Sequence, residues 1–143
     1  MNDSAVDMNK VKRLLQSHRV FAGLNGEELQ LMCDVSSIED FAVGTDLIKE
    51  EKPNHFIYLI LEGEVYIKSY GKKIDERFVG SLMGVISAAG LGALHEDYEA
   101  VEVVAATAVQ AVCFPINVIH KMAEKNKQFS EALYDAAMTR LLK

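Results

Sequence analysis

The segment from residue 41 to residue 67 constrains the fold more than any other part of the chain. It alternates short apolar runs with turn-forming residues: a turn at Gly44, a second turn at residues 52–54 (KPN), and a long β-rich run that is broken at Gly63. Glycine, proline and asparagine punctuate strands because they adopt or impose turn conformations. The aliphatic and aromatic residues between them favour extended chain. This segment therefore predicts consecutive short strands joined by tight turns.

The same reading extends along the chain and predicts a mostly β core. A hairpin turn is expected at residues 70–73 (YGKK), where a glycine separates two strand-like runs. Strands are expected near residues 36–41, 46–50, 55–62, 64–70, 74–79, 99–105 and 108–114.

Helices are expected at both ends of this core. Apolar residues recur at helical spacing between residues 8 and 18. Asn25, three residues before Glu28, indicates a helix start in which each side chain satisfies a free backbone amide. Pro115 suits the first turn of a helix that runs to about residue 126, since its missing N–H would have no partner there anyway. A last helix is expected from about residue 127 to the end.

The pattern as a whole resembles the cyclic-nucleotide-binding domain family, which includes catabolite-activator-type regulators, kinase regulatory subunits and nucleotide-gated channels. Besides residues 41–67, the resemblance rests on residues 20–24 (VFAGL) with the helix start that follows, and on residues 79–84 (VGSLMG). It covers roughly residues 18–142. It implies a mainly β fold with flanking helices, a β-roll of the double-stranded β-helix or jelly-roll type.

The resemblance also implies how the chain is divided. N-terminal helices (1–35) pack on the roll, the roll (36–114) contains a phosphate-binding cassette (80–100), and two C-terminal helices (115–143) follow, all in one domain. In the family's transcription factors a helix-turn-helix domain comes next. This sequence contains none, and its net charge of −6 gives no attraction to a polyanion, so nucleic acid is not expected as a partner.

In family members that bind cyclic nucleotides, the cassette presents backbone amides and an Arg to the phosphate and a Glu to the ribose. Oriented amides favour an anion, and a guanidinium pairs with it bidentately. Aligned on Gly84, the ribose-binding carboxylate is replaced by Val85. Aligned on the strand that follows, the arginine position holds Glu99. The cassette is therefore expected to be degenerate.

A second feature supports this expectation. Between Phe78 and His120 the sequence contains no Lys or Arg, so no alternative alignment supplies the missing cation. Residues 90–97 contain an insertion relative to the family pattern, and its two glycines and acidic residues predict a mobile segment at the outer edge of the pocket.

Three interpretations of this region remain open. The cassette helix is a solvent-shielded turn that packs on the roll; or the aliphatic residues 82–94 enclose a cavity for an apolar ligand such as an acyl chain; or a true cyclic-nucleotide sensor uses backbone amides and a hydroxyl of Ser81, Ser87 or Thr107. The candidate pocket residues are Gly80, Ser81, Leu82, Met83, Gly84, Val85, Ile86, Ser87 and Glu99.

Catalysis, cofactors and metals are not expected. The four histidines, His18, His55, His95 and His120, lack the paired spacing of metal ligands, and the sequence has no nucleophile elbow or Walker loop. Neither a basic, apolar leader nor a membrane-length apolar run is present, which favours the cytoplasm. Cys33 and Cys113 are expected to be buried free thiols.

The last helix is expected to form a homodimer. Its apolar residues form two flanks, of which one can be buried on the roll and the other remains exposed. In the family, this exposed flank forms a parallel dimer interface. The dimer-helix residues are Phe129, Leu133, Tyr134, Ala137, Met138 and Leu141. Taken together, the sequence predicts a non-catalytic regulatory or sensor module that does not bind cAMP or cGMP in the usual way and that acts through a protein partner or a different ligand.

Overall fold

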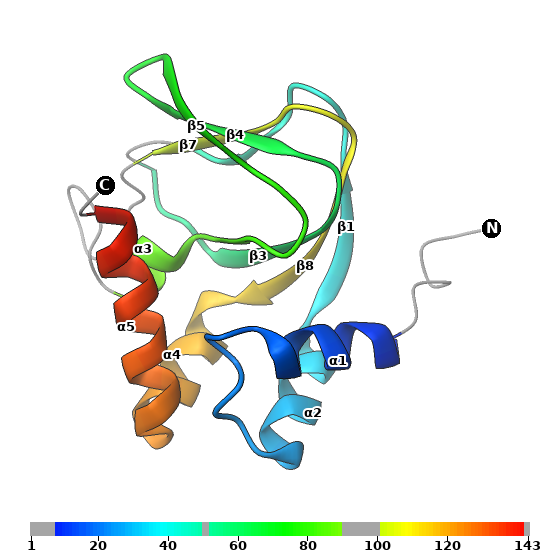
Figure 1. Cartoon of the computed structure of the whole chain (residues 1–143), viewed down its shortest axis with the longest axis vertical. Coiled ribbons are helices and arrows are strands. Elements are labelled where there is room, and N and C mark those ends of the chain that lie inside the picture. Colours follow the sequence, from blue (N-terminus) through cyan, green and yellow to red (C-terminus); the bar gives the residue numbers. More distant parts are fainter. Residues whose placement is uncertain (1–7, 50–51, 90–100, 142–143) are drawn as a thin grey trace.

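The computed structural model describes residues 8–49, 52–89 and 101–141. In these residues two β-sheets form a roll at one end of the molecule, and the helices gather at the other end (Figure 1). The elements are α1 (Met8–Ser17), α2 (Gly26–Val35), β1 (Ser37–Phe41), β2 (Asp46–Ile48), β3 (Phe56–Glu62), β4 (Val65–Ser69), β5 (Lys72–Arg77), β6 (Leu82–Met83), α3 (Val85–Ala88), β7 (Glu102–Ala105), β8 (Val109–Pro115), α4 (Ile116–Lys125) and α5 (Lys127–Leu141).

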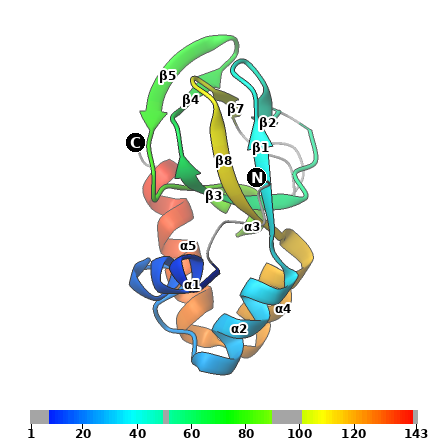
Figure 2. The ribbon, with the colours of Figure 1, turned by 90° about the vertical axis from the view of Figure 1, so that its right-hand side faces the viewer.

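Each sheet has four strands, with antiparallel neighbours. One sheet has the order β1-β8-β3-β6 and the other the order β2-β7-β4-β5. Figure 2 shows the two sheets facing each other above the helices. The expectation of a mainly β fold, a β-roll with flanking helices, is confirmed.

Strand β3 is apolar throughout its middle because both of its faces are covered. Tyr58 and Ile60 point into the roll, whereas Ile57 and Leu59 point toward the helices. Successive side chains of a strand alternate between faces, so two cores require an uninterrupted apolar run. The roll core consists of Leu47, Ile48, Tyr58, Ile60, Val65, Ile67, Met83, Val103, Ala105, Val109, Ala111 and Cys113.

A second core, the helical core, joins the outer face of the β1-β8-β3 sheet to the helices. Three aromatic rings stand at its centre: Phe21 lies 5.4 Å from Phe114 and 5.7 Å from Phe129, measured between ring centroids. All three side chains are fully buried. Aromatic pairs at such distances contribute about 0.5–1.5 kcal/mol beyond the area that they bury, so the rings tie the N-terminal segment, the sheet and α5 together.

The starts of α2 and α5 are capped by side chains. The expected capping box is confirmed: the Glu28 amide donates to Asn25 Oδ1 at 2.8 Å, and the Asn25 amide donates to Glu28 Oε1 at 2.9 Å. Asn126, which the sequence analysis did not single out, performs two tasks. Its Oδ1 accepts from the Phe129 amide at 3.0 Å, and its Nδ2 donates to Glu28 Oε1 at 3.0 Å. The start of α5 is thereby linked to the start of α2.

Three expected boundaries are corrected. The hairpin turn is two residues long, Tyr70 and Gly71, with φ angles of 50° and 79°; such a turn matches the twist of the strands, so β5 begins at Lys72 rather than near residue 74. Pro115 ends β8 and caps α4 instead of lying in its first turn. Strand β6 was not expected, since two residues are too short to show a period.

Candidate functional site

The expected cassette begins with a sharp turn at Gly84. Its φ is 99°, a conformation that favours glycine. A Cβ atom at this position would lie 2.9 Å from the Phe56 carbonyl oxygen and 2.9 Å from Asn54 Nδ2. Asn54 is buried, and its Oδ1 accepts from the Phe56 amide at 3.4 Å. The turn is therefore pressed against the start of β3, where any side chain would displace backbone.

The helix that follows the turn, α3, is short and apolar where the structure describes it. Val85 and Ala88 are 1% and 3% exposed and belong to the helical core, and Ile86 is also buried. The helix packs against α5 and α4, and His120 Nε2 lies 3.0 Å from the Ala88 carbonyl oxygen. The helical, shielded conformation agrees with the first of the three interpretations.

The residues before the turn divide between the two cores. Gly80 donates its amide to the Ile60 carbonyl oxygen at 2.9 Å, and Ser81 accepts from the Ile60 amide at 3.0 Å. Leu82 then enters the helical core and Met83 enters the roll core. The segment thus crosses from the edge of β3 to α3 and fills both cores with aliphatic side chains.

Two of the expected site elements cannot be placed in this geometry. Glu99 and the insertion at 90–97 lie outside the described residues, and for Ser87 only the backbone is described. Thr107, the third candidate hydroxyl, lies far from the cassette turn in sequence and hydrogen-bonds elsewhere: its Oγ1 accepts from the Glu64 amide at 3.0 Å. This hydrogen bond stabilises the turn at Gly63 in the roll.

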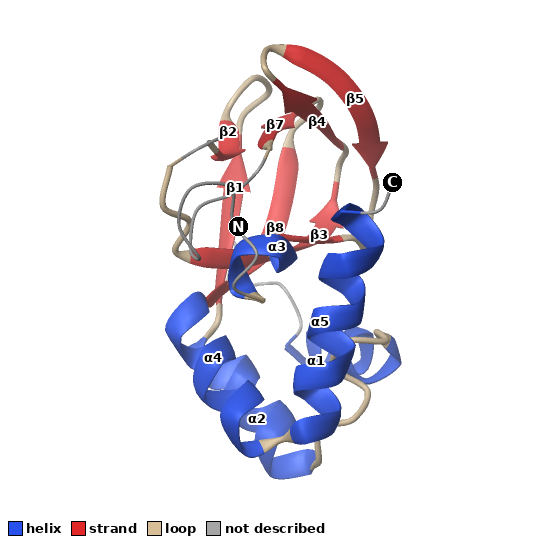
Figure 3. Ribbon diagram, turned by 90° about the vertical axis from the view of Figure 1, so that its left-hand side faces the viewer, coloured by secondary structure: helices blue, strands red, loops and turns tan. Residues whose placement is uncertain are grey.

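A cavity of about 180 Å³ lies beside α3, and we call it the cassette cleft. The cassette contributes Ser81, Leu82 and Val85 to its lining, and Arg19 and Arg77 bring two positive charges. Its remaining lining residues are His18, Val20, Ala136 and Thr139. Val85 therefore faces this cleft and the helical core, on the side of the molecule where α5 runs along the cassette (Figure 3).

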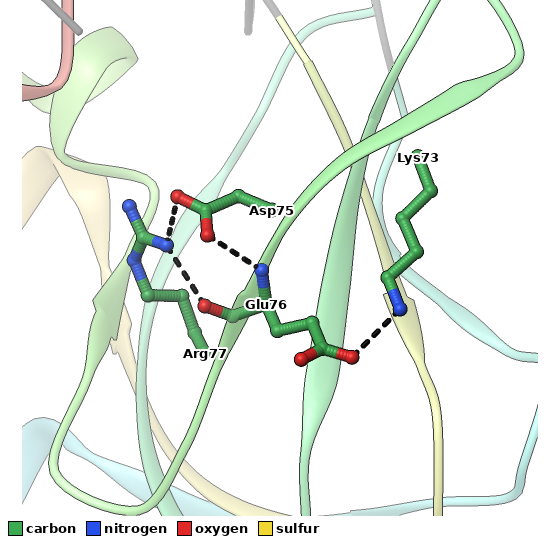
Figure 4. A network of polar contacts seen from close by, with 4 residues as sticks. All are labelled: Lys73, Asp75, Glu76 and Arg77. Carbon is green, nitrogen blue, oxygen red and sulfur yellow. Dashed lines mark hydrogen bonds and ion pairs between the residues drawn. The ribbon is translucent and has the colours of Figure 1, made fainter.

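Arg77 is the site residue that sequence reasoning missed. It precedes the stretch that lacks Lys and Arg by one position, and its side chain is 18% exposed. Figure 4 shows its guanidinium directed at its own strand: it forms an ion pair with Asp75 and donates to the Glu76 carbonyl oxygen at 2.8 Å. The positive charge nearest to the cassette in sequence is therefore already paired.

The dimer-helix residues separate into an inner and an outer group. Phe129, Leu133 and Ala137 are at most 3% exposed and fill the helical core. Tyr134 is 49% exposed and Met138 is half-buried, while the side chain of Leu141 lies outside the description. The exposed flank of α5 is thus centred on Tyr134.

Other chemistry has little support in the residues that the structure describes. Among them, no group of three or more His, Cys, Asp or Glu side chains could hold a metal ion. Both cysteines are free and buried, as expected. Within the described part of the chain, no helix combines the length and apolar character needed to cross a membrane.

Comparison with known proteins places this geometry in a fold. No family model matches the sequence, and no curated protein matches it. Among solved structures, a candidate cyclic-nucleotide-binding protein from Geobacter metallireducens is 21% identical, with a TM-score of 0.75 and coverage of 96% of this chain and 96% of that chain. The sensor domain of the transcriptional regulator DNR from Pseudomonas aeruginosa is 21% identical, with a TM-score of 0.76 and coverage of 91% and 92%.

A third structure belongs to a larger protein. The regulatory subunit of a cAMP-independent protein kinase A from Trypanosoma cruzi, bound to guanosine, is 18% identical, with a TM-score of 0.75; the match covers 94% of this chain and 49% of that one. These solved structures thus include a candidate cyclic-nucleotide-binding protein, a sensor domain and a kinase regulatory subunit. The chain has the fold that these proteins share.

Proposed function

We propose that the chain is a non-catalytic regulatory module of the cytoplasm that does not bind cAMP or cGMP through the contacts usual for its fold, and that acts through a protein partner or a different ligand. The observation that carries this proposal is the burial of Val85. An isopropyl group that is 1% exposed stands where the resemblance requires a carboxylate, and it offers no acceptor to a ribose hydroxyl.

The charge distribution supports the same proposal. No Lys or Arg occurs between Phe78 and His120, and Arg77 is engaged by Asp75. A hydrogen bond to a charged group contributes about 1.5–3 kcal/mol. Loss of both the guanidinium and the carboxylate would therefore weaken a cyclic-nucleotide site by about two to four powers of ten.

Titration calorimetry of the intact chain with cAMP, cGMP and guanosine tests this proposal. We expect no saturable heat with either cyclic nucleotide up to millimolar concentration. Guanosine, the ligand of the Trypanosoma cruzi subunit, is included because it carries no phosphate and so separates recognition of the nucleoside from recognition of the anion. A dissociation constant for cAMP or cGMP of about ten micromolar would overturn the proposal.

Binding of cAMP or cGMP would favour the alternative, a cyclic-nucleotide sensor with unusual contacts. Arg77 and Ser81 could make such contacts, because both line the cassette cleft. In that case Arg77→Leu should abolish the heat. Arg13→Leu, an exposed arginine of α1 that does not line the cleft, is the matched control.

The module is further proposed to work as a homodimer through the outer flank of α5. Tyr134 is the largest exposed apolar side chain on that helix among its described residues, and aromatic side chains are enriched at interfaces. We expect sedimentation velocity at micromolar concentration to show a dimer, Tyr134→Glu to shift it to a monomer, and the control Tyr134→Phe to leave it unchanged. A monomeric wild-type chain would refute the dimer.

A further inference from the structure

A second and larger cavity opens at the mouth of the roll. It measures about 270 Å³ and is lined by residues of β1, β3 and β8, on the inner face of their sheet. Ligand pockets usually occupy about 300–1,000 Å³, so this cavity suits a small molecule. We call it the roll mouth.

Three aromatic rings line the roll mouth. Tyr58 stands between the other two: its ring centroid lies 5.8 Å from that of Phe41, edge to face, and 6.2 Å from that of Phe56, in a tilted arrangement. Tyr58 is 8% exposed and Phe56 is 39% exposed, so the rings run from the floor of the cavity to its rim. Aromatic faces carry partial negative charge and attract cations.

One carboxylate faces these rings. Glu39 lies on β1 opposite Ala111 of β8 and two positions from Phe41, so strand alternation places it on the inner face. Among the residues that the structure describes, no Lys, Arg or His pairs with Glu39, and none lines the roll mouth. The neighbouring Asp40 also lines the roll mouth, and its Oδ1 accepts from Gln110 Nε2 at 3.2 Å.

Two other ionisable groups of the roll mouth, those of Tyr58 and Cys113, stay neutral at pH 7. Burial raises the pKa of Tyr58 to about 12, with smaller contributions from Cys113 and Glu39. Burial and then the charge of Glu39 raise the pKa of Cys113 to about 12. Glu39 and Asp40 therefore supply the acidic side chains of the roll mouth, and among the described residues no Lys, Arg or His lines the cavity to balance them.

We infer that the roll mouth binds a small organic cation of the alkylammonium class, with its charge toward Glu39 and its methyl or methylene groups against Tyr58, Phe41 and Phe56. An anion is disfavoured by the same carboxylate. This inference deepens the proposed function and rests on it in one respect: it supplies a ligand class for a roll that lacks the usual contacts to cyclic nucleotides.

The probe is tetramethylammonium chloride, and its neutral counterpart of similar size is tert-butanol. Both are titrated into the intact chain at constant ionic strength, with sodium chloride as the salt control, and backbone amide shifts are followed by NMR. We expect saturable shifts at Tyr58 and Cys113 with tetramethylammonium, and binding of tert-butanol at least about tenfold weaker, as expected for a cation–π site with a carboxylate.

Two variants assign the binding. Glu39→Gln should weaken tetramethylammonium binding about tenfold, whereas Glu62→Gln, at the exposed end of β3 and outside the lining of the roll mouth, should leave it unchanged. Phe56→Leu keeps an apolar side chain at the rim and should weaken binding severalfold. Thermal melts show that each variant is folded before it is titrated.

Four results would overturn the inference: no saturable shift with wild-type protein, equal affinity for the cation and for tert-butanol, unchanged binding in Glu39→Gln, or shifts located away from the roll mouth. The titration of cAMP and cGMP is a separate measurement. If those nucleotides bind, the proposed function fails whatever the cation does; if only the cation fails, the roll mouth is not the ligand site and the proposed function stands on its own test.

Discussion

The roll mouth and the cassette cleft have separate linings, and they differ in the sign of the charges that line them. The roll mouth presents Glu39 beside three aromatic rings. The cassette cleft presents Arg19 and Arg77 beside aliphatic residues of the cassette. These two positive side chains thus line the cassette cleft and not the roll mouth, and one of them is paired with Asp75.

This difference shows how one fold can change its ligand without changing its strands. In β3, Phe56 and Tyr58 face the roll mouth while Ile57 and Leu59 face the helices. The backbone requires only that both faces be covered. The charges at the two cavities come from a few side chains on β1, on β5 and between α1 and α2.

The turn at Gly84 should produce the largest effect on stability. Gly84 has no room for a Cβ, because the Phe56 carbonyl oxygen and Asn54 Nδ2 would each lie 2.9 Å from it. We expect Gly84→Ala to lower the free energy of unfolding by about 3 kcal/mol, the sum of a positive φ and a displaced backbone. Urea unfolding followed by circular dichroism measures it.

Gly80→Ala is the matched control for this prediction. Gly80 also has a positive φ, 91°, but a Cβ there would meet nothing within 4 Å. It should cost about 1–2 kcal/mol from the backbone conformation alone. Equal losses in the two variants would contradict the close approach at Gly84, and with it the rigid division between roll mouth and cassette cleft.

Much of the fold could be predicted because the strands and turns carry strong local signals. The glycines at 44, 63 and 71 all have positive φ angles, and the capping box of α2 forms as expected. Two features could not be predicted from the sequence, for physical reasons. Strand β6 has two residues, which is too few for a period, and the bridge from Asn126 to Glu28 joins residues that are distant in sequence.

The candidate site was less predictable, because its chemistry depends on the face that each side chain takes. The absence of Lys and Arg after Phe78 could be seen in the sequence, whereas the ion pair of Arg77 with Asp75 could not. Glu39 and Tyr58 are separated by 19 positions in sequence, and only the pairing of β1 and β3 with β8 brings them to one cavity. The sequence pattern of a single strand does not reveal which residues of other strands line the same cavity.

A smaller effect should distinguish the electrostatics of the two cores. The thiol of Cys113 in the roll has a pKa raised from 9.0 to about 12, by burial and then by the charge of Glu39. The thiol of Cys33 in the helical core has a pKa raised by burial, but the charge of Lys12 lowers it in opposition. The negative field of the roll mouth should therefore be visible as a difference between the two thiols in alkaline solution.

The sign of the effect follows from the direction of the shifts. Above pH 9 the thiols of the unfolded chain lose their protons while Cys113 in the folded chain keeps its own, so rising pH favours the unfolded state. The stability that Cys113 contributes is complete below pH 9 and is lost as the pH rises toward 12. Between pH 8 and pH 10 the loss from Cys113 should reach about 1 kcal/mol, and Tyr58, whose pKa is raised from 10.0 to about 12, adds a smaller loss near pH 10 that is the same in both cysteine variants. We expect Cys113→Ala to flatten the dependence of unfolding free energy on pH over this interval, and Cys33→Ala to flatten it less. An equal change in both variants would contradict a larger rise in the pKa of Cys113 than in that of Cys33.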